Sequence, residues 1–148
     1  MTRIDFYILE GEQGGQTYGR LVACRVAEKA YLAGHRVYIH AGDAREAEQL
    51  DELLWTFRQG SFVPHQKLEA GTPADALSPI HIGWGGEPEV HDEVLINLAV
   101  EVPLFFSRFQ RVAEIVPADD QAKQQGRARY KFYRDRGYPL ETHSLAQG

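Results

Sequence analysis

Short apolar runs alternate along this chain with stretches in which apolar residues recur every three to four positions. The short runs are rich in aromatic and β-branched residues, which is typical of buried strands. They occupy residues 4–9, 36–41, 80–84, 94–98 and 112–116. The longer spacing predicts helices at residues 16–33, 43–55, 104–109 and 120–136, and residues 58–79 and 85–92 are expected to form loops.

Capping residues support the ends of two of these helices. Asp43 and Glu46 have the spacing of a capping box at the start of the second helix. Either Asp119 or Asp120 can cap the last helix, and Gly137 marks its end.

The order of elements indicates the fold class. Strand and helix alternate twice, and then two strands, a helix, a strand and a helix follow. This order predicts an α/β fold with a Rossmann-like, mainly parallel sheet and helices on both faces. With 148 residues, of which 43% are hydrophobic, we expect a single domain over residues 1–148. Its ordered core is expected at about residues 3–138, followed by a short C-terminal tail.

Composition and charge indicate where the protein is located and which ligands it is expected to bind. The single cysteine, Cys24, excludes an internal disulfide, and the N-terminus has neither a signal peptide nor a membrane span, so we expect a cytoplasmic protein. The formal net charge of -5 argues against general attraction to DNA or anionic lipid. However, residues 121–136 hold six of the sixteen basic residues and one acid, Asp135.

The loop at residues 11–15 is the strongest candidate for a nucleotide site. In a doubly wound fold, phosphates bind at this position against a helix N-terminus. Neither G-x-G-x-x-G nor a P-loop motif is present, and Glu10 and Glu12 would repel a pyrophosphate. Asp43 lies where a ribose-binding acid is found, but it also suits a helix cap. A nucleotide site and a plain tight turn are both open, and the motifs favour the turn.

No other pattern indicates catalysis or metal binding. The six histidines lack the i, i+4 spacing of a zinc-binding helix, and Cys24 has no cysteine partner. His91 and Asp92 are expected in a solvated loop, and Cys24 is expected to be buried. We therefore predict no catalytic residue, no metal and no cofactor.

The last helix carries an exposed basic stripe. At about 100° per residue, its cations and one aromatic ring fall within an arc of about 100°, while Ala128 and Phe132 are expected to point toward the core. The stripe consists of Lys123, Arg127, Tyr130, Lys131 and Arg134. A solvated helix face normally mixes charges of both signs, whereas this stripe has no acid. Its ligand is expected to be nucleic acid or an acidic peptide.

Large aromatic residues gather near the end of the second helix. Trp55, Phe57 and Phe62 lie close in sequence, and Pro64 follows them. These rings either cap the sheet as part of the core or form an exposed patch for a protein partner. The sequence leaves both interpretations open.

Several segments together resemble one protein family. These are FYIL near the start, LDELLW, SFVPH, IHIGW, VLINL and the closing RARYKFYRDRGY. In this order and at these spacings, the chain resembles the chi subunit of bacterial DNA polymerase III. The resemblance extends over nearly the whole chain and is weakest at residues 66–78 and 85–92.

The resemblance implies a non-catalytic accessory subunit of the replisome in the cytoplasm. Members of the family form a one-to-one heterodimer with the psi subunit, which tethers them to the clamp loader. They also bind the acidic, phenylalanine-ended C-terminal tail of single-stranded-DNA-binding protein (SSB), and in some members a helicase shares the psi surface. The polymerase activity belongs to the holoenzyme, and neither a cofactor, specific DNA binding nor a membrane is implied.

The resemblance also assigns residues to two surfaces. The SSB-tail site would comprise Lys123, Arg127, Tyr130, Lys131, Arg134 and Val116. The psi contact would comprise Trp55, Phe62, Val63 and Pro64. Gly126, inside the last helix, would either loosen the helix start or allow close approach of a peptide backbone. The alternatives to this function are a nucleotide-binding enzyme and a direct binder of single-stranded nucleic acid through the last helix.

Overall fold

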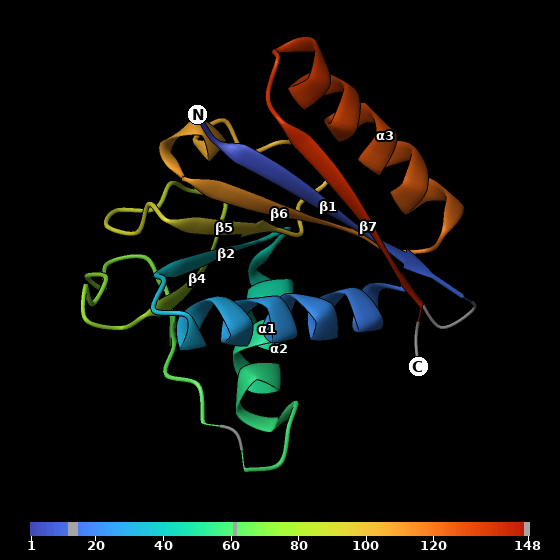
Figure 1. Cartoon of the computed structure of the whole chain (residues 1–148). Coiled ribbons are helices and arrows are strands. Elements are labelled where there is room, and N and C mark those ends of the chain that lie inside the picture. The colour runs from blue at the N-terminus through green and yellow to red at the C-terminus, as the bar shows by residue number, and fades with distance from the viewer. Residues whose placement is uncertain (12–14, 61, 147–148) are drawn as a thin grey trace.

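The computed structural model describes residues 1–11, 15–60 and 62–146 and shows one seven-stranded sheet (Figure 1). All of its strand pairs are parallel, and the strand order is β3-β4-β2-β5-β6-β1-β7. The strands are β1 (Arg3–Glu10), β2 (Val37–Ala41), β3 (Gln66–Lys67), β4 (Ile80–Trp84), β5 (Val94–Asn97), β6 (Arg111–Val116) and β7 (Leu140–Ala146). The predicted α/β class and parallel sheet are confirmed.

Helices cover both faces of this sheet (Figure 1). They are α1 (Gln16–Leu32), α2 (Ala44–Thr56) and α3 (Asp120–Asp135), with a 3-10 turn, η1 (Phe106–Arg108). The connections through α1 and α2 step along the sheet in one direction, and those through η1 and α3 step in the other. Because crossovers between parallel strands are right-handed, α1 and α2 cover one face while η1 and α3 cover the opposite face.

Each face has its own apolar core. Beneath α1 and α2, the core is built from aliphatic side chains such as Leu9, Ile39 and Leu50. Beneath α3, it is rich in aromatic rings, among them Phe6 and Tyr133. The helices on the two faces of the sheet therefore pack against cores of different composition, one aliphatic and one aromatic.

The predicted helix caps are present. The Asp43 carboxylate accepts a hydrogen bond from the Glu46 amide, and Asp119 accepts one from Ala122 in the same way. The Glu46 carboxylate accepts a hydrogen bond from the amide of Gly42 rather than from that of Asp43. In the capping box of α2, the bond from Asp43 is as predicted, whereas the bond to Glu46 comes from the residue before Asp43.

The C-terminal segment corrects the predicted boundary of the ordered core. Residues beyond 138, expected to be a tail, form strand β7, which pairs with β1 along its length. The sequence LETHSLA has no buried residue because the strand lies at the edge of the sheet, so its apolar pattern is weak. The expected helix at 104–109 is the shorter turn η1, and the loop at 58–79 contains the two-residue strand β3.

Gly126 lets α3 lie unusually close to the sheet. A Cβ atom at this position would meet Cγ1 and Cγ2 of Val116 at 2.9 and 3.0 Å. Of the two roles left open for this glycine, close approach is the one that the structure supports, but the neighbour is strand β6 rather than a bound peptide.

Across the part of the chain that the structure describes, no helix combines the length and apolar character needed to cross a bilayer.

Candidate interaction surfaces

The basic stripe of α3 faces away from the sheet. Arg127, Lys131 and Arg134 are exposed, while Lys123 and Tyr130 are half-buried. Within the described residues, no carboxylate lies within ion-pair distance of Lys123, Arg127 or Lys131. The expectation that the stripe has no acid is wrong at one end, because Arg134 lies 3.4 Å from the carboxylate of the neighbouring residue 135. Three cations on one side of α3 therefore have no ion-pair partner in the part of the chain that the structure describes.

Tyr130 joins the stripe to the aromatic core. Its ring meets Phe6 of β1 edge-on, with ring centroids 5.3 Å apart. The half-buried Ile8, also on β1, packs against the same core. A ligand on the stripe would thus have an apolar surface beside the cations.

Val116, which the family resemblance assigns to the SSB-tail site, is buried. Its side chain is 2% exposed and is covered by α3 at Gly126. A valine at the end of a parallel strand beneath a closely packed helix becomes part of the core. Its contribution to any site would be to set the position of α3.

The expected inner face of α3 also requires correction. Ala128 is exposed and Phe132 is half-buried, whereas the residues that face the sheet are Ala122, Gly126, Arg129 and Tyr133. Phe132 packs edge-on against Phe106 of η1. The apolar periodicity of α3 is misleading because a charged residue, Arg129, occupies a buried position.

Arg129 is buried because it pairs with Glu114 of β6. Its Nε donates to Glu114 at 2.8 Å, the Tyr133 hydroxyl donates at 2.7 Å, and Asn97 Nδ2 donates at 3.0 and 3.1 Å. Burial raises the pKa of Glu114, while the charge of Arg129 and these donors oppose that shift. Arg129 and Asn97 can only donate through these nitrogens, so the Glu114 carboxyl is the shared acceptor at the centre of this network. This network could not be predicted from sequence patterns, because its members come from three elements.

A second surface lies at the end of α2, on the other face of the sheet. Trp55 is 50% exposed and Phe62 is 71% exposed, with ring centroids 5.4 Å apart. His65 supports them from below, with its ring 4.5 Å from that of Trp55. Of the two interpretations of these aromatics, the exposed patch is confirmed for Trp55 and Phe62.

Two further residues assigned to this surface differ from each other. Val63 is 1% exposed and belongs to the core beneath α1 and α2, so its assignment to a surface contact is wrong. Pro64 is half-buried and lines a pocket of about 510 Å³ together with Trp55 and Phe62. Alternate residues of an extended segment point to opposite sides, which separates Val63 from Phe62 and Pro64.

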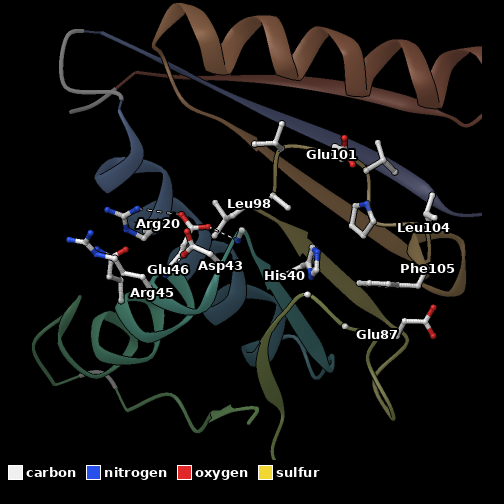
Figure 2. A pocket seen from close by; sticks show the side chains of 18 of the residues that line it. Arg20, His40, Asp43, Arg45, Glu46, Glu87, Leu98, Glu101, Leu104 and Phe105 are labelled. Carbon is white, nitrogen blue, oxygen red and sulfur yellow. Dashed lines mark hydrogen bonds and ion pairs between the residues drawn. The ribbon is translucent and has the colours of Figure 1, made fainter. Parts of the chain in front are cut away.

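A cavity of about 870 Å³ opens where β2 and β5 end (Figure 2). This is the position at which α/β proteins bind nucleotides. However, Glu46 occupies the donors that would bind a phosphate, because it accepts from the Gly42 amide at 2.9 Å and pairs with Arg20 at 3.3 Å (Figure 2). His40 also faces this cavity, and burial lowers its pKa, which keeps the ring uncharged. Of the groups that line this cavity, Glu46 therefore takes the Gly42 amide and Arg20, and Arg45 is the cation left at its rim.

The loop at residues 11–15, a candidate phosphate site for which the motifs favour a plain turn, lies only partly within the described residues. Residues 12–14, which include Glu12, lie outside the described residues. Gly15 precedes α1 and provides no side-chain cap.

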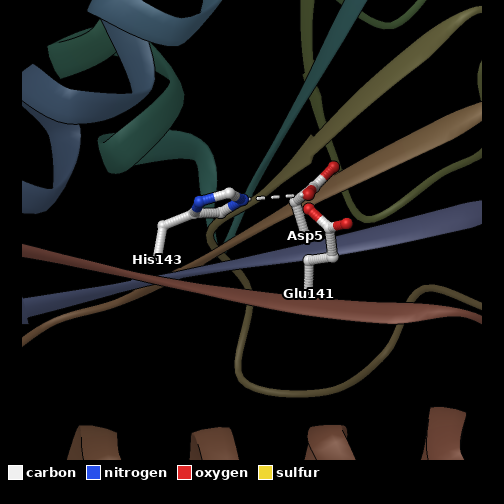
Figure 3. A group of neighbouring side chains, drawn as sticks. All are labelled: Asp5, Glu141 and His143. Carbon is white, nitrogen blue, oxygen red and sulfur yellow. Dashed lines mark hydrogen bonds and ion pairs between the residues drawn. The ribbon is translucent and has the colours of Figure 1, made fainter.

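One group of potential metal ligands occurs among the described residues: Asp5, Glu141 and His143 (Figure 3). Asp5 accepts hydrogen bonds from His143 at 3.0 Å and from Arg111 at 3.1 Å, and Arg3 pairs with Glu141 at 2.8 Å. Burial alone would raise the pKa of Asp5, but the bonds from His143 and Arg111 and the nearby positive charges lower it. Two guanidinium groups already neutralise the carboxylates, so the group is an ion-pair network between β1, β6 and β7.

His91 is not solvated, contrary to the expectation for its loop. It is 4% exposed, and its ring stacks on that of His81 with centroids 3.8 Å apart. Cys24 is buried as expected, and burial raises the pKa of its thiol to about 12, which makes it unreactive.

Comparison with known proteins agrees with the resemblance found in the sequence. Residues 1–141 match the family model described as DNA polymerase III chi subunit, HolC. The chain is 42% identical to the DNA polymerase III subunit chi of Pseudomonas aeruginosa over 98% of each chain. It is 33% identical to that of Escherichia coli, over 96% of this chain and 97% of the relative.

A solved structure resembles the fold without indicating function. The crystal structure of T4 UvsW superposes on 98% of this chain and 42% of its own, with a TM-score of 0.68 and 7% identity. At this identity the likeness concerns the α/β fold alone.

Proposed function

This chain belongs to the DNA polymerase III chi subunit family, and from that membership we propose that it is a non-catalytic tether in DNA replication. On one side it binds the psi subunit, and on the other it binds the acidic C-terminal tail of SSB. The accessory role in DNA polymerase III follows from the family, and the two contacts are the proposal.

The observation that carries the proposal is the set of unpaired cations on α3. Lys123, Arg127 and Lys131 repel one another at helical spacing, and within the described residues no carboxylate offsets them. A ligand with several carboxylates would remove this repulsion. The acidic peptide that the family resemblance implies has that chemistry.

The aromatic side of the stripe suits the end of such a peptide. Arg127 and Lys131 would bind its carboxylates through charge-assisted hydrogen bonds. Tyr130, held edge-on by Phe6, would pack against a terminal phenylalanine ring. Cations alone would accept any polyanion, so the ring beside them favours a peptide with an aromatic end.

Bare nucleic acid is a weaker candidate for the same stripe. The protein carries a formal net charge of -5, which repels a polyanion at long range. Only three of the stripe's cations are unpaired. A short peptide with a few carboxylates matches this number better than a nucleic acid backbone.

The tail contact is tested with a fluorescent peptide ending in Asp-Ile-Pro-Phe, titrated with the protein and followed by anisotropy. We expect one-to-one binding that Arg127→Ala weakens by about tenfold or more, because a charged hydrogen bond is lost. Arg25→Ala, at an exposed arginine of α1 on the opposite face of the sheet, is the matched control, and it is expected to change affinity less than about threefold. Equal effects of the two variants would contradict the assignment.

The psi contact is proposed at the surface of Trp55 and Phe62. Two large exposed rings in contact are a signature of a protein interface, since aromatic anchors dominate binding energy. The variant Trp55→Ala with Phe62→Ala is expected to lose psi in pull-down while keeping tail binding. Circular dichroism checks that the variant is folded. A folded variant that still binds psi would contradict this contact.

A further inference from the structure

A third exposed apolar side chain lies at the surface of Trp55 and Phe62. Leu77 is 82% exposed and lines the same pocket of about 510 Å³ as the two rings. It comes from the loop before β4, which is distant in sequence from α2. Single exposed leucines are ordinary, but three large apolar residues around one pocket form a continuous patch.

The loop that carries Leu77 is held by side chains from β4 and from the segments that precede β2 and β5. Arg36 donates to the Leu77 carbonyl at 3.1 Å, just before β2. His81 of β4 bonds the Asp75 carbonyl at 2.7 Å, and His91 bonds the Ser78 carbonyl at 2.8 Å. Because carbonyl oxygens only accept, the Nε2 atom of each histidine donates.

The two histidines form a rigid support beneath this loop. Their stacked rings are 1% and 4% exposed, and their planes are inclined by only 14°. The Leu77 carbonyl is bonded by Arg36 at the surface, and the Asp75 and Ser78 carbonyls are bonded by buried histidines, so the backbone that carries this leucine is ordered before binding. Ordering a side chain on binding costs free energy, so a fixed anchor binds more tightly than a mobile one.

Acidic side chains border the patch on α2. Glu48, Asp51 and Glu52 precede Trp55 by seven, four and three residues, and these spacings place all four on one side of the helix. Glu48 and Glu52 are exposed, and Asp51 lies 3.1 Å from His65 beneath the ring of Trp55. A partner segment on this patch therefore meets apolar pockets bordered by negative charge.

We propose that Leu77 is the third anchor of this surface, that His81 and His91 position it, and that the surface binds an apolar segment of psi flanked by lysine or arginine. The proposal rests on the psi contact proposed above. It adds the residue that completes the contact and the chemistry of the segment that occupies it.

Leu104 provides a matched control for Leu77. It is 86% exposed, but it lies in the connection between β5 and η1, on the α3 side of the molecule. Truncating either leucine removes the same atoms from solvent-exposed positions. A difference in psi affinity between the two variants therefore reports the location of the contact.

The experiment measures the affinity of purified psi for the full chain by calorimetry. We expect Leu77→Ala to weaken binding about tenfold and Leu104→Ala to leave it within about twofold. If the double variant of Trp55 and Phe62 weakens binding but Leu77→Ala behaves like Leu104→Ala, the third anchor is wrong and the psi contact stands. If none of these variants weakens binding, the psi contact itself is wrong.

The positioning role and the charge of the partner are tested in the same assay. His91→Leu removes the hydrogen bond to the Ser78 carbonyl and keeps an apolar contact with the ring of His81. We expect this variant to weaken psi binding about threefold in the wild-type background but not in the Leu77→Ala background. Glu48→Gln with Glu52→Gln is expected to flatten the salt dependence of binding. Equal losses from His91→Leu in both backgrounds would overturn the positioning role, and unchanged salt dependence would overturn the basic flanks.

Discussion

The exposed faces of α2 and α3 have opposite charge and lie on opposite faces of the sheet (Figure 1). The helix α2 carries one basic and four acidic residues and presents Trp55, whereas α3 carries five basic and two acidic residues and presents Tyr130. Each combines one sign of charge with an aromatic ring. The net charge of -5 conceals this separation, and the two surfaces suit partners of opposite charge.

The two helices also rest on different supports. Ala47, Leu50 and Leu54 of α2 are buried among aliphatic side chains. In contrast, α3 is held by the ion pair of Arg129 with Glu114 and by its close approach to the sheet. Aliphatic packing tolerates small adjustments, but a buried ion pair fails when one partner is removed.

The largest expected effect is loss of the support beneath α3. Glu114→Ala leaves Arg129 charged and buried without its partner, so we expect the free energy of unfolding to fall by about 3–5 kcal/mol. Urea denaturation followed by circular dichroism measures this change. Arg134→Ala, at an ion pair with Asp135 in which the side chains are 59% and 50% exposed, is the control and should cost less than about 1 kcal/mol. A small loss from Glu114→Ala would show that α3 does not depend on the pair.

Gly126→Ala tests the close approach of α3 to β6. Helix propensity alone favours alanine by about 1 kcal/mol, but the added Cβ would lie 2.9 Å from Val116. We expect the clash to prevail and the free energy of unfolding to fall by about 1–3 kcal/mol. Combining it with Val116→Ala should recover part of the loss. A stabilised single variant would mean that the helix can move away at little cost.

Charge reversal should separate the two surfaces. Lys131→Glu is expected to weaken binding of the acidic peptide by about tenfold and to leave psi binding unchanged, because it places repulsion on the α3 stripe alone. Glu52→Lys is expected to do the opposite. Both titrations use the same protein preparations, so each partner serves as the control for the other. A variant that weakens both contacts would show that the surfaces are coupled.

The smallest expected effect is a dependence of the free energy of unfolding on pH, which arises from the histidines beneath the loop of Leu77. Burial lowers the pKa of His81 and His91 below 6.5, and for His91 the neighbouring His81 adds to the shift. In the unfolded chain both rings take up protons near their ordinary pKa, while in the fold they stay neutral. Their contribution to stability is therefore complete above pH 6.5 and is lost as the pH falls from there through the lowered pKa.

We expect a loss on the order of 1 kcal/mol in the free energy of unfolding between about pH 7 and pH 5.5, to which His40 adds. Asp5, whose pKa is lowered from 3.8, acts only in more acidic solution. Binding of the acidic peptide, which uses lysine and arginine, should stay constant over this range. An NMR titration that places both histidines at or above 6.5 would contradict the prediction.

The features that could be predicted from the sequence are those that depend on residues close together in the chain. Alternating strand and helix patterns predicted the parallel α/β sheet, and the spacing of Lys123, Arg127 and Lys131 predicted a basic stripe that the structure places on the surface. The cap at Asp43 was predictable for the same reason, since its partners lie within three residues. Family motifs spread over the chain gave the identity of the fold and its accessory role.

Only the tertiary structure decided which distant residues meet. Strand β7 is recognisable by its pairing with β1, because an exposed edge strand has little apolar pattern of its own. Arg129 turns inward because Glu114, fifteen residues away on β6, neutralises it. Leu77 joins Trp55 because buried histidines fix a loop whose sequence predicts no regular structure. Burial and pairing depend on contacts between elements, and local sequence spacing does not encode such contacts.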